Sequence, residues 1–235
     1  MKLRMQITKD KDIRFISHLE YVRTIGRAIR RAKLPAAYSE GFNPHLKFSL
    51  ASALGVGVVS YTEFVEIELA EPMEVEKAAL ALDAALPRGI RVLAADAVDT
   101  HHAALMSQAA GASYRVTLPY SKDVSAAVAE FNAAPELLFK KAAPKTKAKF
   151  KDIDVKFYIP QLTAEQTETE TIFSFDCKIT PTGSMKAVDL LNALNEQYGL
   201  ALPVEMADIE RLRLYRNNKN GKPIPMLNSD AVTLV

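Results

Sequence analysis

The order in which strand-like and helix-like segments follow one another constrains this chain most. Residues 64–69, FVEIEL, alternate apolar with acidic side chains, which is the two-residue period of a strand with one buried face. The first strands are expected at 3–8, 47–51, 61–69 and 90–95, and the first helices at about 18–33 and 75–86. The first 98 residues therefore predict the order β-α-β-β-α-β.

The same order returns after residue 112. We expect strands at 114–119, 136–141, 173–180 and 209–215, helices at about 121–133 and 184–198, and an additional strand at 153–162. Ser121 is expected to cap the first of these helices, and Gly199 to end the second. We therefore predict an α+β protein of two ferredoxin-like units in tandem, each an antiparallel sheet with helices on one face.

These patterns divide the chain into an N-terminal domain (1–98), a linker (99–112) and a C-terminal domain (113–235). The linker is rich in alanine, histidine and glutamine and has no strong periodicity. The tail over 217–235 contains two prolines, and we expect it to wrap the surface or to be partly mobile.

The helix predicted at 18–33 has a defined start and one basic face. Ser17 and Glu20 have the spacing of a capping box, in which each side chain bonds the backbone amide of the other. An apolar stripe is formed by Leu19, Val22, Ile25, Gly26, Ile29 and Ala32, and an adjacent arc by Arg23, Arg27, Arg30 and Arg31. Glu20 is the only acid between Phe15 and Ser39, so the arc predicts an anion-binding surface. The alternative is an ordinary solvated helix face.

The loop that follows, residues 38–45, mixes aromatic and hydrogen-bonding side chains with a glycine and a proline. Gly41 permits a positive φ and a close backbone approach, and Pro44 holds the preceding residue extended. We assign the predicted anion- or RNA-binding set to Arg14, His18, Arg23, Arg27, Arg30, Arg31, Tyr38, Ser39, Gly41, Phe42, Asn43 and His45. Two of these, His45 and His18, are candidates for a catalytic group.

A second cationic tract occupies residues 140–151 and has no acid between residues 137 and 151. From it, Lys145, Lys147 and Lys149 join the predicted phosphate-binding set, with a solvated lysine loop as the alternative. Acids gather elsewhere, at 63–76 and 165–170, so the net charge of +2 reflects a polarised chain.

The segments Arg14–Leu19 and Tyr38–His45, with the arginines between them, resemble the radical-SAM-linked protein family of bacteria. The resemblance is dense from Leu3 to about Val98, and Glu20 stands where the family is expected to have aspartate. The resemblance implies a radical SAM enzyme as a partner in trans, and it implies no particular chemistry for this chain.

Several classes of protein are disfavoured by the sequence. The single cysteine, Cys177, excludes an internal disulfide framework and cannot supply the three thiolates of a radical SAM cluster. No HExxH pair, paired cysteines or nucleotide-binding glycine loop occurs, so we expect no metal or cofactor in this chain. The N-terminus lacks the apolar region of a secretory signal, and no apolar run approaches the roughly 20 residues that span a bilayer. A soluble cytoplasmic protein is therefore expected.

Three functions remain open at this point. The first is a non-catalytic module that binds structured RNA, such as tRNA or rRNA, for a radical SAM enzyme. The second is a protein–protein adaptor whose arginine face docks an acidic surface of that enzyme. The third is a metal-independent endoribonuclease that uses His45 or His18, an analogy that rests on fold alone. We expect the binding module, and the oligomeric state is not predicted.

Overall fold

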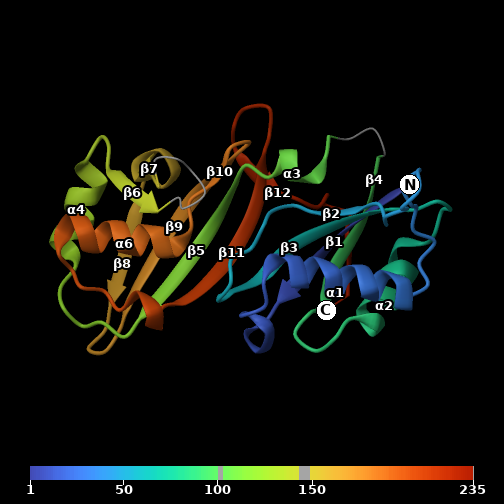
Figure 1. Ribbon diagram of the computed structural model, residues 1–235, viewed down its shortest axis with the longest axis horizontal. Coiled ribbons are helices and arrows are strands. Elements are labelled where there is room, and N and C mark those ends of the chain that lie inside the picture. Colours follow the sequence, from blue (N-terminus) through green and yellow to red (C-terminus); the bar gives the residue numbers. More distant parts are fainter. Residues whose placement is uncertain (100–102, 143–148, 235) are drawn as a thin grey trace. The chain divides into compact units, whose positions relative to one another are not determined.

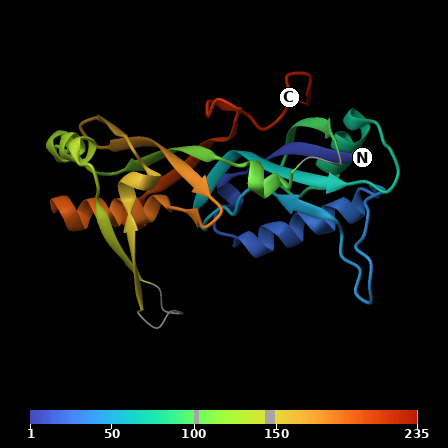
Figure 2. The same ribbon diagram turned by 90° about the horizontal axis from the view of Figure 1, so that it is seen from above.

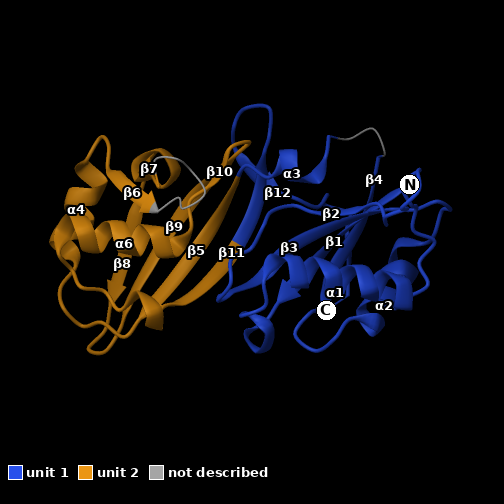
Figure 3. Cartoon of the chain, in the orientation of Figure 1, with its two compact units in different colours: residues 1–110, 213–235 blue, residues 111–212 orange. Residues whose placement is uncertain are grey.

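The computed structural model describes residues 1–99, 103–142 and 149–234. The chain forms two compact units, coloured separately in Figure 3: unit 1 comprises Met1–Ala110 and Arg213–Val235, and unit 2 comprises Gly111–Leu212. The C-terminal tail therefore packs with the N-terminal unit, whereas the sequence pattern assigns residues 113–235 to one C-terminal domain. Within the predicted linker, a short helix buries Leu105.

Unit 1 is an antiparallel sheet with two helices on one face (Figures 1 and 2). Its elements are β1 (Lys2–Lys9), η1 (Lys11–Ile13), α1 (His18–Arg31), β2 (Phe48–Leu50), β3 (Val58–Glu68), α2 (Val75–Ala85), β4 (Val92–Val98), α3 (Leu105–Gln108), β12 (Pro223–Pro225) and β13 (Val232–Thr233). The strand order is β2-β3-β1-β4-β13. The paired strands run antiparallel, and Met5 of β1 lies opposite Val65 of β3 and Ala95 of β4.

The core of unit 1 lies between this sheet and its helices. Leu3, Met5 and Ile7 alternate along β1 and are at most 1% exposed, as the two-residue period requires. Ile25 and Ile29 of α1 are equally buried, so the predicted apolar stripe is confirmed in the middle of the helix. Leu19 contradicts the same stripe, because it is 55% exposed in the first turn of α1.

The opposite face of the unit 1 sheet is polar and holds the tail. Arg4 and Glu66 form a buried ion pair with 2.9 Å between Nη2 and Oε2. The Arg4 Nη1 also donates to the carbonyl oxygen of Met226 at 2.8 Å, and the Asn228 side chain donates to Asp96. Charged groups that are buried need hydrogen-bond partners, and the tail supplies partners for Arg4 and Asp96. The tail therefore lies on the surface of this sheet, as the sequence led us to expect.

Unit 2 contains β5 (Gly111–Leu118), α4 (Ser125–Ala133), β6 (Leu138–Ala142), β7 (Phe150–Asp154), α5 (Val155–Tyr158), β8 (Leu162–Gln166), β9 (Thr171–Thr180), β10 (Gly183–Ser184), α6 (Ala187–Tyr198) and η2 (Val204–Met206). The strand β11 (Asp208–Asn217) spans the division between the units. The sheet order in unit 2 is β8-β9-β5-β11, with β10 paired to the end of β9, while β6 and β7 form a separate hairpin.

The structure corrects the sequence prediction for unit 2 at three places. The strand expected at 136–141 pairs only within the hairpin, and the strand beside β9 is β8. The extra strand expected at 153–162 is interrupted, because the Asp154 side chain accepts from the amide of Lys156 and caps α5. Ser121 does not cap α4, which begins at Ser125. Gly199 does end α6 in the left-handed region, with φ +63°.

The chain therefore has a mixed α+β fold with antiparallel sheets and several helices. No helix in the described ranges is both long and apolar enough to cross a membrane.

Candidate nucleic-acid interface

The start of α1 is fixed by the predicted capping box. The Ser17 amide donates to Glu20 Oε2 at 2.8 Å, and the Glu20 amide donates to Ser17 Oγ at 3.2 Å. These bonds from Ser17 lower the pKa of the Glu20 carboxyl, and the charge of Arg23 lowers it further. The capping box thus makes His18 the first helical residue, and its side chain is half-buried there.

One side of α1 presents three arginines to solvent. Arg23, Arg27 and Arg30 are exposed, and they follow one another at spacings of four and three residues, which places them on one strip of the helix. We call these three residues the arginine strip. Among the described residues, no carboxylate forms an ion pair with any of the three, and no acceptor hydrogen-bonds to them.

The other two predicted arginines have structural contacts. Arg31 is exposed, but its Nη2 donates to the carbonyl oxygen of Ala85 at the end of α2, 2.7 Å away. Arg14 is half-buried, and its guanidinium lies over the ring of Phe15 at 4.9 Å from the centroid. Arg31 therefore links α1 to α2, and Arg14 packs against the ring of Phe15.

The loop over residues 38–45 is a closed hairpin that projects beside the C-terminal end of α1 (Figure 2). The Ser39 amide donates to the carbonyl oxygen of His45 at 2.8 Å, and the His45 amide donates to Ser39 Oγ at 3.0 Å. Gly41 has φ +112°, as its role in a tight turn requires. Phe42 is fully exposed at the tip and Tyr38 is 47% exposed at the base.

The polar residues of this loop also face solvent. Asn43 and His45 are exposed, and no hydrogen bond to the His45 ring is found in the part of the chain that the structure describes. A general acid or base is normally oriented by a neighbouring group. The loop thus presents its polar side chains to solvent, where a ligand can contact them.

Sequence reasoning missed the exposure of three apolar side chains, Phe15, Leu19 and Val56. Their exposed fractions are 69%, 55% and 61%. The amide of Gly57 donates to the carbonyl oxygen of Arg14 at 2.8 Å, so the segments that carry Phe15 and Val56 are joined. The signal that could have found Phe15 is its position just before a cap, outside any strand or helix period.

The lysine tract is less uniform than the sequence suggests. Lys145 and Lys147 lie outside the described residues. Lys149 immediately precedes β7, is exposed and has φ +57°. The Lys141 Nζ instead forms an ion pair with Asp189 of α6, with 2.6 Å between Nζ and Oδ2. Thus Lys141 anchors the hairpin.

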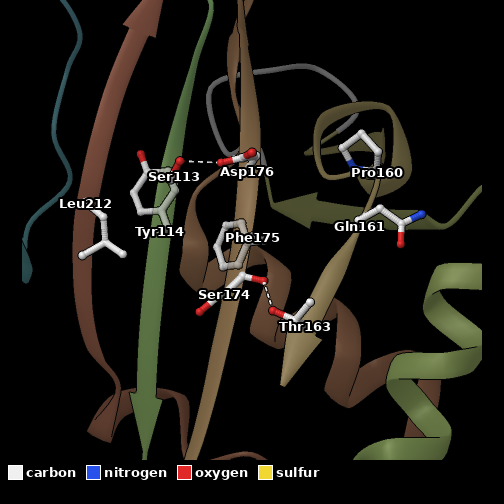
Figure 4. A pocket seen from close by; sticks show the side chains of 9 residues that line it. All are labelled: Ser113, Tyr114, Pro160, Gln161, Thr163, Ser174, Phe175, Asp176 and Leu212. Atoms are coloured by element: carbon white, nitrogen blue, oxygen red, sulfur yellow. Dashed lines mark hydrogen bonds between the residues drawn. The ribbon is translucent and has the colours of Figure 1, made fainter. Parts of the chain in front are cut away.

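A cavity of about 450 Å³ lies on the sheet of unit 2 and contains none of the predicted site residues. It is lined by Ser113, Tyr114, Pro160, Gln161, Thr163, Ser174, Phe175, Asp176 and Leu212 (Figure 4). Ser113 Oγ donates to Asp176 Oδ1 at 2.5 Å, and the rings of Tyr114 and Phe175 stack with centroids 5.5 Å apart. The hydrogen bond and the stacked rings thus hold four of the side chains that line the cavity.

Metal and thiol chemistry find little support in the described ranges. No group of three or more histidine, cysteine, aspartate or glutamate side chains is placed there to hold a metal ion. Cys177 is buried on β9, and burial raises the pKa of its thiol to about 11. The thiol is therefore protonated and inert at neutral pH.

Comparison with curated proteins finds no match. Among solved structures, the chain is similar to a chain in the "Crystal Structure of a Cbf5-Nop10-Gar1 Complex", with 13% identity and a TM-score of 0.48. That alignment covers 92% of this chain but only 50% of the other. The "Crystal Structure of an Unknown Protein from Galdieria sulphuraria" matches with 15% identity and a TM-score of 0.25, covering 89% of this chain and 96% of that chain. Neither similarity carries an argument about function.

A family model gives the identification. Residues 2–189 match the family described as "Uncharacterized protein conserved in bacteria (DUF2344)", and the chain belongs to that family.

Proposed function

We propose that this protein is a non-catalytic RNA-binding module, and that unit 1 makes the principal contact through α1 and the 38–45 loop. The observation that carries the proposal is the arginine strip. Guanidinium groups placed side by side repel one another; among the described residues no carboxylate forms an ion pair with these three, and the charge of Glu20 acts on Arg23 alone. A ligand with regularly spaced negative charges supplies partners for them, and phosphate, like carboxylate, matches the bidentate geometry of arginine.

RNA is favoured over a small anion because of what lies beside the strip. Tyr38 and Phe42 are exposed aromatic side chains, and exposed aromatics stack on unpaired bases. Asn43 and His45 add side chains that hydrogen-bond to base edges or to the ribose. A single sulfate or phosphate ion would contact the arginines and would make no contact with the aromatic and polar side chains of the loop.

The fold and the partner complete the proposal. The two strand orders, β2-β3-β1-β4 and β8-β9-β5-β11, support a description as two ferredoxin-like units in tandem. The radical SAM enzyme that the resemblance implies would act in trans on the bound RNA. That partner rests on the similarity of Arg14–Leu19 and Tyr38–His45 to the radical-SAM-linked family.

Fluorescence anisotropy with labelled bacterial tRNA and rRNA fragments tests the function directly. We expect binding that weakens as salt rises, with a log–log slope of at least about −2. The charge-reversed variant Arg27→Glu should bind at least about tenfold more weakly, because it puts a carboxylate at the centre of the strip. Absence of salt-dependent binding, for the protein alone and with its co-purified enzyme, would overturn the proposal.

A further inference from the structure

We propose that the RNA segment held by unit 1 is single-stranded, about five nucleotides long, and lies along α1 with one base stacked on Phe15 and another on Phe42. This inference rests on the proposed RNA-binding function and specifies the form of RNA that the site accepts. An unpaired loop of a larger folded RNA satisfies it as well as a free strand does.

Phe15 and Phe42 flank the arginine strip in the sequence, and the loop that carries Phe42 projects beside the C-terminal end of α1 (Figure 2). Phe15 is 69% exposed and precedes the first turn of α1, while Phe42 is fully exposed on the loop beside the last turn (Figure 2). Both rings are accessible to a ligand, and exposed aromatic rings are groups on which unpaired bases stack. A strand that follows the arginines therefore meets an aromatic ring at each end.

Phe15 is held in place before any ligand binds. Lys9 is 1% exposed, and its Nζ donates to the carbonyl oxygens of Arg14 at 2.8 Å and Gly55 at 3.2 Å. The amide of Gly57 donates to the same Arg14 oxygen. The Arg14 guanidinium then packs over the Phe15 ring. These bonds fix the backbone next to Phe15, so less conformational freedom is lost when its ring stacks on a base.

The length of the strip sets the length of RNA. From Arg23 to Arg30 the helix rises about 10 Å at 1.5 Å per residue, and the three guanidiniums along it can bind three phosphates; with one stacked base beyond each end, the segment has about five nucleotides. The arginines lie within this distance, so the phosphates between two stacked bases are the ones they reach.

A duplex does not fit the same arrangement. In a duplex the base faces are covered by their neighbours, and the deep major groove of A-form RNA excludes side chains. A duplex would contact the arginines and leave both aromatic rings without a base. The preference for a single strand therefore comes from Phe15 and Phe42, and the salt dependence comes from the arginines.

The test compares single-stranded RNA of three, five, seven and nine nucleotides with a duplex of the same sequence, by fluorescence anisotropy on the full chain. We expect affinity to rise up to about five nucleotides and then level off, with the duplex at least tenfold weaker. Phe15→Ala and Phe42→Ala should each weaken single-strand binding by at least about fivefold and leave the salt slope unchanged, because stacking involves no phosphate. Both side chains are exposed, so the variants keep the fold.

Phe157→Ala is the matched control, since that side chain is 51% exposed and belongs to unit 2. It should bind as the wild type does. Equal affinity for single strand and duplex, or unchanged binding by both Phe15→Ala and Phe42→Ala, would overturn this inference while the RNA-binding function stands. Salt-independent binding, or none, would overturn the function and the inference together. A third outcome would also overturn both: the chain binds no RNA but captures a partner protein, this interaction persists after nuclease treatment, and Phe15→Ala abolishes it.

Discussion

Removing the charge of the arginine strip should change the salt dependence of RNA binding more than it changes the fold. The perturbation is the triple variant Arg23→Gln, Arg27→Gln and Arg30→Gln. Glutamine has nearly the same helix propensity as arginine, and none of the three guanidiniums bonds to another described residue. We therefore expect each substitution to change the free energy of unfolding by less than about 0.5 kcal/mol.

The magnitude follows from the release of counterions. Each phosphate contact with a single strand contributes about −0.7 to the slope of log affinity against log salt, so three contacts contribute about −2. For the wild type, raising salt from about 50 to 200 mM should weaken binding by a further factor of about 20 through these contacts alone. The triple variant should lose that share of the slope and bind more weakly at every salt concentration.

The assay is fluorescence anisotropy over a range of potassium chloride concentrations, with urea denaturation to check the fold. A control with the same change in net charge is Lys77→Gln, Lys122→Gln and Lys219→Gln, since all three lysines are exposed outside the proposed interface. This control should lower the slope only slightly. An equal loss of slope in both variants would refute the reasoning, because general charge rather than the strip would then explain binding.

Three further predictions concern stability and reactivity. Ser17→Ala removes the capping box and should cost about 1 kcal/mol of stability in urea denaturation. The Ser17 amide, which alanine would keep, is the first cause of the lowered pKa of Glu20, and its bond to the carboxylate contributes stability above the ordinary glutamate pKa that is lost as pH falls through the depressed value. Glu20→Gln, which cannot titrate, should therefore flatten the acid side of the stability profile. Arg4→Ala leaves the buried Glu66 short of its closest partner and should cost about 3 kcal/mol, whereas a cost under about 1 kcal/mol would contradict the buried-pair assignment. Cys177, with its thiol pKa raised to about 11, should react with iodoacetamide at pH 8 only after unfolding, and rapid reaction of the native protein would contradict its burial.

Local features of unit 1 could be predicted from the sequence. The start of α1 follows from Ser17 and Glu20, because a capping box involves residues only three apart. The exposure of Leu19 could not be predicted, since helical periodicity assigns a face but does not say which part of that face the sheet covers. The bond of Arg31 to Ala85 joins positions 54 residues apart, which no local pattern reveals.

The topology of unit 2 is harder to predict, because more of its segments have the alternation of a strand than its main sheet contains. The hairpin of β6 and β7 alternates like any strand pair, and only the tertiary pairing of β8 with β9 excludes it from the main sheet. The candidate site shows the same limit. Composition singles out the arginines and the 38–45 loop, while the exposure of Phe15 depends on how the segments around Arg14 and Gly57 are joined.

The most direct test of the central claim is to observe the arginine side chains while RNA binds. Nuclear magnetic resonance of the Nε–Hε groups in the full chain, titrated with a five-nucleotide single strand, reports each guanidinium separately. We expect the resonances of Arg23, Arg27 and Arg30 to shift together and to saturate, while those of Arg4 and Arg91, which are bonded to Glu66 and Asp83, stay in place. Saturable shifts confined to other arginines, or no shifts at all, would contradict the proposal that the strip on α1 binds RNA.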